Sequence, residues 1–346
     1  MLLLITAVST TFAWFSLNDA AWVDDFELEL HNSDKLLIRH ESGQFKQMLI
    51  EEDIVAAINS ERESEKITSI SDISFSEVYS IDGVSFNQLV PKYDDMNRKT
   101  VSLEKASENS YLRFKLYFRI EQGNENEGQL HPDYYLILSN SDNEEGVKKT
   151  SFTAKDQAIK LVNSLVTTEN EFKMDDSLSV NPINALKLAI KGDSNAASSN
   201  PEVDYIYDLA DELDLGSYAI DDRILNELEI TDSRFSSSKN AGFTYYNNIN
   251  NHILNPIGYY EDDNELEENV EIVNNLLSKI RYDFSDSLGK FEYDEQTKQY
   301  NEVGITISIW LEGFDADNLI GLDSSVIKCL LSFKLVEGGS LSAIYS

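Results

Sequence analysis

Three carboxylates near the C-terminus have a spacing that could bind a divalent cation. Glu312, Asp315 and Asp317 follow an apolar segment, and Gly313 lies among them. Carboxylate oxygens are the ligands that Ca²⁺ prefers, and a glycine allows a sharp turn around an ion. The segment lacks the twelve-residue spacing of an EF-hand. Two interpretations therefore stay open, a Ca²⁺ site or a polar turn that leaves a sheet.

The residue types that usually carry catalysis are sparse. The four histidines include no pair at i and i+4, and no HExxH, GxSxG, P-loop or GxGxxG motif occurs. The single cysteine, Cys329, lies on the apolar side of an alternating segment, where a thiol packs as a small hydrophobe. We therefore expect a protein that is not an enzyme and has no cofactor beyond Ca²⁺. A secreted hydrolase stays a further alternative, because paired acids cannot be recognised among so many carboxylates without distances.

The elements that must position these residues are mostly strands. Apolar residues alternate with polar ones, as in a strand with one buried face. The clearest segments are 26–30, 112–120, 134–138, 186–190, 305–311 and 327–335. In the fourth, apolar residues alternate with Lys187 and Lys191. Long gaps separate the segments, so we predict a mainly β chain with inserted helices, folded as an antiparallel jelly-roll-like β-sandwich.

Helical spacing interrupts the strands at three places. The segments concerned are 44–59, 153–165 and 266–280. The second begins with a plausible Thr153 cap. Regular βαβ alternation is absent, which argues against a doubly wound fold. An acidic stretch at 202–232 indicates a helical, acidic insertion at about 193–300, within a domain that spans 14–346.

The charge balance excludes several partners. The chain carries 28 Lys and Arg against 62 Asp and Glu, a net charge of -34. Nucleic-acid binding needs clustered cations, and an anionic membrane surface would repel this chain. The simplest interpretation of the acidity is a solvated surface kept soluble by repulsion. The Tyr- and Asn-rich stretch 244–251 suits adhesive contacts, although ordinary strands and turns also have this composition.

The N-terminal segment has the length of a signal peptide. Residues 1–12 are largely apolar but too few to span a bilayer. Small residues precede the bond between Ala13 and Trp14, which predicts cleavage there. The basic n-region is missing, so we expect residues 1–13 to be a truncated signal peptide. A buried N-terminal strand is the alternative. The mature protein is then expected to be extracellular or on the cell surface, with no membrane span.

Two segments carry a resemblance to a known family. The stretch Thr11-Phe12-Ala13-Trp14-Phe15-Ser16 resembles the cleavage region of Gram-positive proteins that a dedicated ER-type signal peptidase processes, the TasA-like and camelysin-type proteins. The strand 305–311 with Glu312-Gly313-Phe314-Asp315-Ala316-Asp317, and the later Leu331-Ser332-Phe333-Lys334, are similar to the closing part of that group. The match covers the two chain ends, and the insertion has no counterpart. Camelysin relatives are classed as metallopeptidases, but no zinc motif here supports that activity.

The resemblance implies a secreted jelly-roll-like protein of the biofilm matrix. In matrix-forming members, an N-terminal strand is donated to the next subunit. Residues 14–30 would form such an arm, and head-to-tail donation propagates as a fibre. The arm could equally pair within its own sheet. We therefore predict a structural or adhesive protein, with a glycan- or cell-wall-binding module that uses Ca²⁺ as the alternative.

Overall fold

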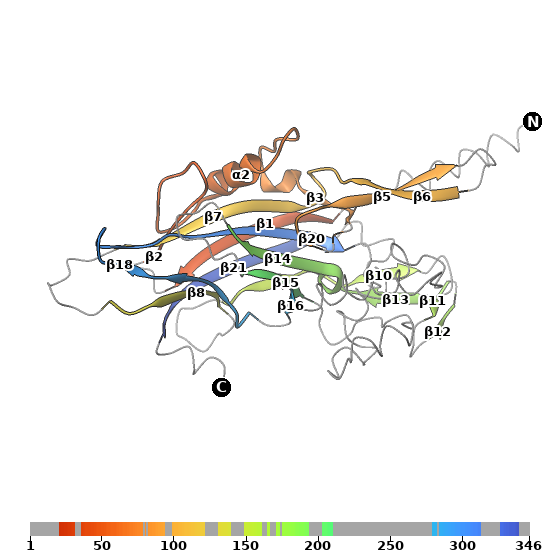
Figure 1. Cartoon of the computed structure of the whole chain (residues 1–346). Helices are drawn as coiled ribbons and strands as arrows, with labels where there is room; N and C mark the ends of the chain where they lie inside the picture. The colour runs from red at the N-terminus through yellow and green to blue at the C-terminus, as the bar shows by residue number, and fades with distance from the viewer. Residues whose placement is uncertain are drawn as a thin grey trace, which may run out of the picture.

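The computed structural model shows a mainly β protein in which stacked strands run along the long dimension of the molecule (Figure 1). One α-helix, α2 (Glu51–Ser60), lies among the described residues, together with the 3₁₀ turns η1 (Ile70–Asp72) and η2 (Pro182–Ala185). No helix in this part of the chain is long and apolar enough to cross a bilayer. The structure describes residues 21–31, 36–78, 80, 82–93, 99–121, 131–139, 149–160, 165–166, 171–173, 175–193, 203–209, 279–281, 284–312 and 326–338.

Two large sheets contain all six segments whose alternation predicted strands. The six-stranded sheet has the order β17 (Ser287–Phe291), β8 (Tyr134–Leu138), β21 (Val326–Glu337), β1 (Ala21–His31) and β3 (Ser74–Phe75), with β9 (Ser151–Thr153) also on β21. The seven-stranded sheet has the order β16 (Ile280–Arg281), β15 (Asp204–Asp208), β14 (Leu186–Gly192), β20 (Val303–Glu312), β7 (Leu112–Ile120) and β2 (Leu36–Arg39), with β4 (Glu77–Val78) on β20.

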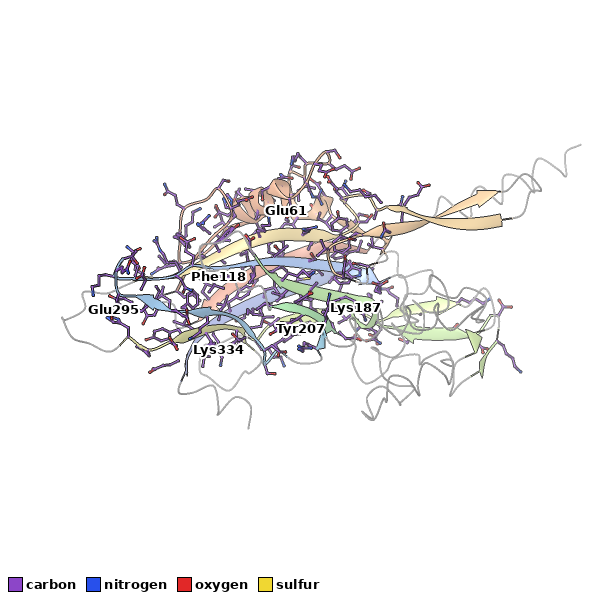
Figure 2. All side chains as sticks on the ribbon, viewed as in Figure 1. Glu61, Phe118, Lys187, Tyr207, Glu295 and Lys334 are labelled. Carbon is purple, nitrogen blue, oxygen red and sulfur yellow. The ribbon has the colours of Figure 1, made fainter. Side chains whose placement is uncertain are left out.

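The apolar faces of the two sheets meet in one hydrophobic core. Phe26 of β1 contacts Phe114 of β7 edge to face, with ring centroids 5.6 Å apart. Phe118 of β7, which is labelled in Figure 2, meets Phe333 of β21 with ring centroids 4.9 Å apart. Since successive side chains of a strand point to opposite faces, the alternation in the sequence translates directly into this buried layer.

The central pairing of the six-stranded sheet joins strands from distant parts of the chain. β1 lies parallel to β21, from Trp22 opposite Val326 to His31 opposite Lys334. Its other neighbour is the two-residue strand β3, which is antiparallel. β15 with β16 and β20 with β4 are also parallel. The sheets are therefore mixed, which corrects the prediction of an antiparallel sandwich.

Helix α2 confirms part of one helical prediction. It begins at Glu51 rather than at residue 44, with acidic residues in its first turn, where the helix dipole favours them. Ile54, Ala57 and Ile58 are buried, and the helix packs on β7. Residues 266–278 of the third predicted helix, 266–280, lie outside the described residues, so this helix stays a prediction.

The helix predicted at 153–165 is wrong. Residues 157–160 form β10 (Gln157–Lys160), which pairs with β13 (Ser177–Val180), and β11 (Leu165–Val166) pairs with β12 (Glu171–Phe172). Cross-strand partners decide the conformation here, and local spacing does not reveal them. Two further ribbons are β5 (Asn87–Tyr93) with β6 (Lys99–Lys105), and β18 (Tyr293–Asp294) with β19 (Gln299–Tyr300).

The predicted insertion at 193–300 stays a prediction, because residues 210–278 lie outside the described residues. Both ends of this region join the main sheets. β15 pairs with β14 in the seven-stranded sheet, and β17 pairs with β8 in the six-stranded sheet.

Candidate functional site

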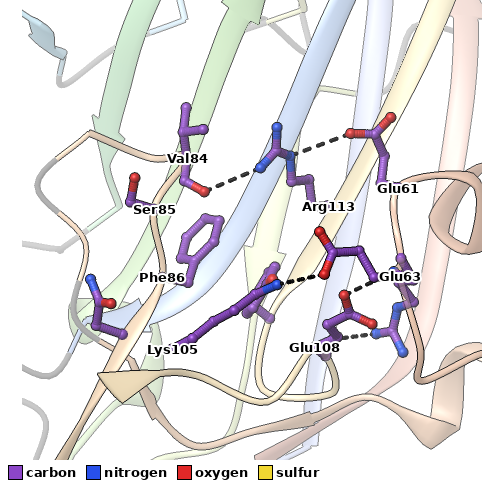
Figure 3. Close-up of a pocket in the computed structure, with 11 residues that line it drawn as sticks. Glu61, Glu63, Val84, Ser85, Phe86, Lys105, Glu108 and Arg113 are labelled. Carbon is purple, nitrogen blue, oxygen red and sulfur yellow. Dashed lines mark hydrogen bonds and ion pairs between the residues drawn. The ribbon is translucent and has the colours of Figure 1, made fainter. Parts of the chain in front are cut away.

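A cavity of about 300 Å³ opens beside the end of α2. Its walls come from the loop that follows α2, the segment before β5, and the turn between β6 and β7 (Figure 3). These three segments are far apart in the sequence, and polar side chains hold them together. The geometry of this cavity therefore depends on the loop contacts described next.

Glu108 anchors one wall of the cavity. Its carboxylate accepts hydrogen bonds from the backbone N–H groups of Glu63 at 2.9 Å, Ser64 at 3.2 Å and Glu65 at 3.1 Å. Burial alone raises the pKa of this carboxyl, but the three backbone donors outweigh burial and lower its pKa to about 2. Glu108 is therefore a fixed anion that orders the loop after α2.

Arg62 fastens the same loop to the β6–β7 turn. Its guanidinium donates to the carbonyl oxygen of Glu65 at 2.6 Å, to Asn109 Oδ1 at 2.5 Å and to the carbonyl oxygen of Glu108 at 2.5 Å. The residue is buried, with 7% exposed. Burial lowers the pKa of Arg62, while the nearby Glu108 carboxylate acts in the opposite direction. With three acceptors, the guanidinium holds the two loops in one register.

A second set of charges lines the same cavity. Arg113 donates to the carbonyl oxygen of Val84 at 3.1 Å, and its Nε lies 3.5 Å from Glu61 Oε2. Glu61 also pairs with Lys115 at 3.2 Å. Across the opening, Lys105 pairs with Glu63 at 3.1 Å, and both side chains are largely exposed. The Lys105–Glu63 pair is exposed to water and contributes little to stability, whereas the ion pairs of Glu61 are more buried.

Two aromatic rings, those of Phe86 and Tyr111, belong to the lining of the cavity. Phe86 stacks on Tyr111 with a centroid distance of 4.1 Å and an interplanar angle of 23°. The same ring meets Trp310 edge to face at 5.5 Å. Burial is the largest cause of a raised pKa of Tyr111, so its phenol stays neutral at physiological pH. The aromatic part of the lining is thus uncharged.

The charged side chains around this cavity are engaged in contacts that order its loops. Each charged side chain described above has a partner of opposite sign, a set of backbone donors or, for Arg62, a set of oxygen acceptors. General acid–base or nucleophilic catalysis needs a base in hydrogen-bond reach of a nucleophile. Among the residues around this cavity, the observed pairs instead fix loops.

The predicted Ca²⁺ ligands are only partly described. Glu312 is fully buried, and its Oε2 accepts hydrogen bonds from Trp310 Nε1 at 2.7 Å and from the Ser80 backbone N–H at 3.3 Å. Asp315 and Asp317 lie outside the described residues. No group of three or more His, Cys, Asp or Glu that could hold a metal occurs in the described part of the chain. The Ca²⁺ site stays a prediction, with Glu312 directed toward Trp310.

The sequence also indicated a buried cysteine, a cleavage position and four histidines. Cys329 is buried, as its position on the apolar side of β21 predicted. Ala13 and Trp14, the predicted cleavage position, lie outside the described residues. His131 stacks on Tyr293 with a centroid distance of 3.5 Å, next to Tyr300.

The cavity residues have no sequence signal that could have identified them. Glu108 and Arg62 belong to polar turns without a motif, and their importance follows from loops that meet only in the folded chain. Trp310 did have a sequence signal, because it is a large aromatic residue on the polar side of an alternating strand.

Comparisons with protein-family models, with curated proteins and with solved structures found no match to this chain. The resemblance to TasA-like proteins therefore stays a prediction based on the two chain ends.

Proposed function

We propose that this chain is a non-catalytic structural or adhesive protein of a Gram-positive cell surface or extracellular matrix, and that it self-associates by exchanging β1. The observation that supports the proposal is the position of β1. This strand is the first described element, yet it occupies an inner position of the six-stranded sheet, between β21 and β3. An inner strand near one chain end can be replaced by the same strand of another copy without rearranging the remaining strands.

The side chains of β1 match this role. Phe26 and Leu28 are buried in the core, whereas Glu27 between them is exposed. Removal of the strand would open the long edge of β21 and expose apolar surface. An unpaired strand edge is a template for pairing with another chain. In the folded chain, β1 is paired in its own sheet, so assembly would require exchange between two equivalent pairings. The two facing sheets also suit the jelly-roll-like class that we propose for the fold.

Disulfide trapping tests the exchange. Glu27 and Leu330 face each other across the β1–β21 ladder, and Glu27 is exposed while Leu330 is half-buried. In the double variant Glu27→Cys, Leu330→Cys, a disulfide should form within one chain when β1 pairs with its own β21. It should form between two chains when β1 pairs with the β21 of another copy. We expect a ladder of reducible multimers on a denaturing gel after oxidation at high protein concentration.

The single variant Glu27→Cys is the matched control, because one exposed thiol can form dimers but no longer series. If the double variant gives only internally linked monomers at every concentration, assembly by β1 exchange is refuted.

A glycan- or cell-wall-binding function is the second candidate, and an aromatic cluster favours it. Tyr293 and Tyr300 contact His131, and Tyr134 contacts Tyr300. All of these rings but that of Tyr300 are half-buried. Aromatic rings at a surface can stack on sugar rings through their apolar faces. Binding to purified cell walls should fall in Tyr293→Ala. Calorimetry with Ca²⁺ on the parent chain and on Asp315→Ala tests the metal part of this candidate.

A further inference from the structure

A lysine and an aspartate are buried in contact on neighbouring strands. Lys187 of β14 and Asp208 of β15 are directly opposed in the antiparallel ladder. Lys187 Nζ lies 2.9 Å from Asp208 Oδ1, and the two side chains are 1% and 3% exposed. The lysine also donates to the Asn184 carbonyl oxygen at 3.4 Å. Figure 2 places Lys187 amid the packed side chains of the sheets.

This pair lies on the face of the seven-stranded sheet that points away from the main core. Lys187 also faces Trp310 in the ladder with β20, and Trp310 is completely buried. The segment around Gly83 covers this face so closely that a Cβ at Gly83 would lie 2.3 Å from the Cβ of Ala189. The segment around Gly83 therefore lies against Ala189 and Trp310 on this face, and the Lys187–Asp208 contact beside them is almost completely buried.

A buried acid accompanies the pair. Glu312 follows Trp310 by two residues in β20, so both side chains lie on the same face. The register places Trp310 opposite Lys187, and Glu312 therefore lies diagonally across from the lysine. Diagonal neighbours in a sheet are within reach of long side chains. Glu312 is itself fully buried, with Trp310 Nε1 donating to its Oε2 at 2.7 Å.

We propose that Lys187 and Asp208 condense to an intramolecular isopeptide bond, with Glu312 as the proton carrier. Burying two opposite charges is costly, and moving one proton from the ammonium to the carboxylate yields a neutral amine and a neutral acid. The amine lone pair then attacks Asp208 Cγ. Glu312 takes a proton from the nitrogen and passes it to the departing oxygen. A C–O bond breaks, a C–N bond forms and one water leaves, so no oxidant or other reactant is needed.

Position alone favours this reaction. The strands hold amine and carboxyl in contact, which replaces a bimolecular encounter by a step within one molecule. The bond would connect β14 and β15 covalently in a chain that has one cysteine and so cannot form an internal disulfide. The inference holds whether or not the chain assembles through β1.

The same ladder contains a matched comparison pair. Lys191 and Asp204 are also directly opposed on β14 and β15. Their charged atoms are 3.3 Å apart, but the side chains are 28% and 31% exposed. Water stabilises both charges there, so we expect this pair to stay ionic.

Mass spectrometry of the intact purified chain is the test. We expect a mass lower than the sequence mass by one water molecule, and no tryptic cleavage after Lys187. Fragmentation should give one branched peptide that joins Lys187 to Asp208. Lys187→Arg preserves a cation beside Asp208 but should restore the full mass, while Lys191→Arg should leave the deficit unchanged.

Glu312→Gln tests whether Glu312 is needed for bond formation. A glutamine oxygen can still accept the hydrogen bond from Trp310 Nε1 but cannot carry the proton. We expect this variant to fold and to retain the full mass. A parent chain with the full sequence mass would overturn the cross-link. A Glu312→Gln variant that loses water as completely as the parent would overturn the role of Glu312.

Discussion

Replacing Glu108 by glutamine should destabilise the fold in a pH-dependent way. The pKa of this carboxyl is about 2 in the folded chain against an ordinary value of 4.5. The difference corresponds to about 3 kcal/mol of folding free energy, and access of water through the cavity reduces this to about 2 kcal/mol. Because the folded pKa is depressed, this stability is present above pH 4.5 and is lost as the pH falls toward 2. Glu108→Gln keeps the shape but removes the charge that three backbone N–H groups bind.

Urea unfolding at pH 7 and in steps down to pH 2.5 measures this effect. We expect Glu108→Gln to be less stable than the parent by about 2 kcal/mol at pH 7, with the gap closing on acidification. Glu63→Gln is the control, since its largely exposed pair with Lys105 should contribute little to stability. A gap that stays constant with pH, or no loss at pH 7, would refute the assignment of Glu108 as the anion that orders the loop.

Substitutions at three further positions test the packing by thermal and urea unfolding. Gly83→Ala should destabilise by more than about 1 kcal/mol, because Gly83 has a φ of 66° and a Cβ there would meet Ala189; a neutral result would contradict the close seating of this segment. Phe114→Ala should cost about 3–5 kcal/mol as a cavity in the core, with Phe114→Leu less severe. Trp310→Phe should cost about 1–3 kcal/mol by removing the donor to buried Glu312, and an unchanged melting temperature would argue against that bond.

The strands were predictable because one face of each is buried. The alternation in 112–120 and 327–335 reports which side chains enter the core, and both segments became strands with those faces inward. The segment 153–165 failed because its apolar spacing fits a helix as well as short strands. Its partner, β13, lies at 177–180, and only the pairing decides between the two.

The buried charges show where alternation misleads. Lys187 occupies the polar side of β14, which suggests exposure, yet it is 1% exposed. Lys187 lies opposite the buried Trp310, and the segment around Gly83, about a hundred residues earlier, lies against Trp310 and Ala189 on the same outer face of the sheet. Glu108 and Arg62 are likewise defined by loops that meet in space. A local pattern describes one face of one strand and cannot report a second layer that another segment supplies.

The parallel pairing of β1 with β21 determines how the protein responds to tension. Ala21 begins β1, Glu337 ends β21, and the two strands run in the same direction side by side. A pull that separates these two points acts along the strands, so the hydrogen bonds of the ladder are loaded together in shear rather than peeled one after another. Yielding then requires the whole ladder to slip at once, a high barrier that makes forced unfolding slow.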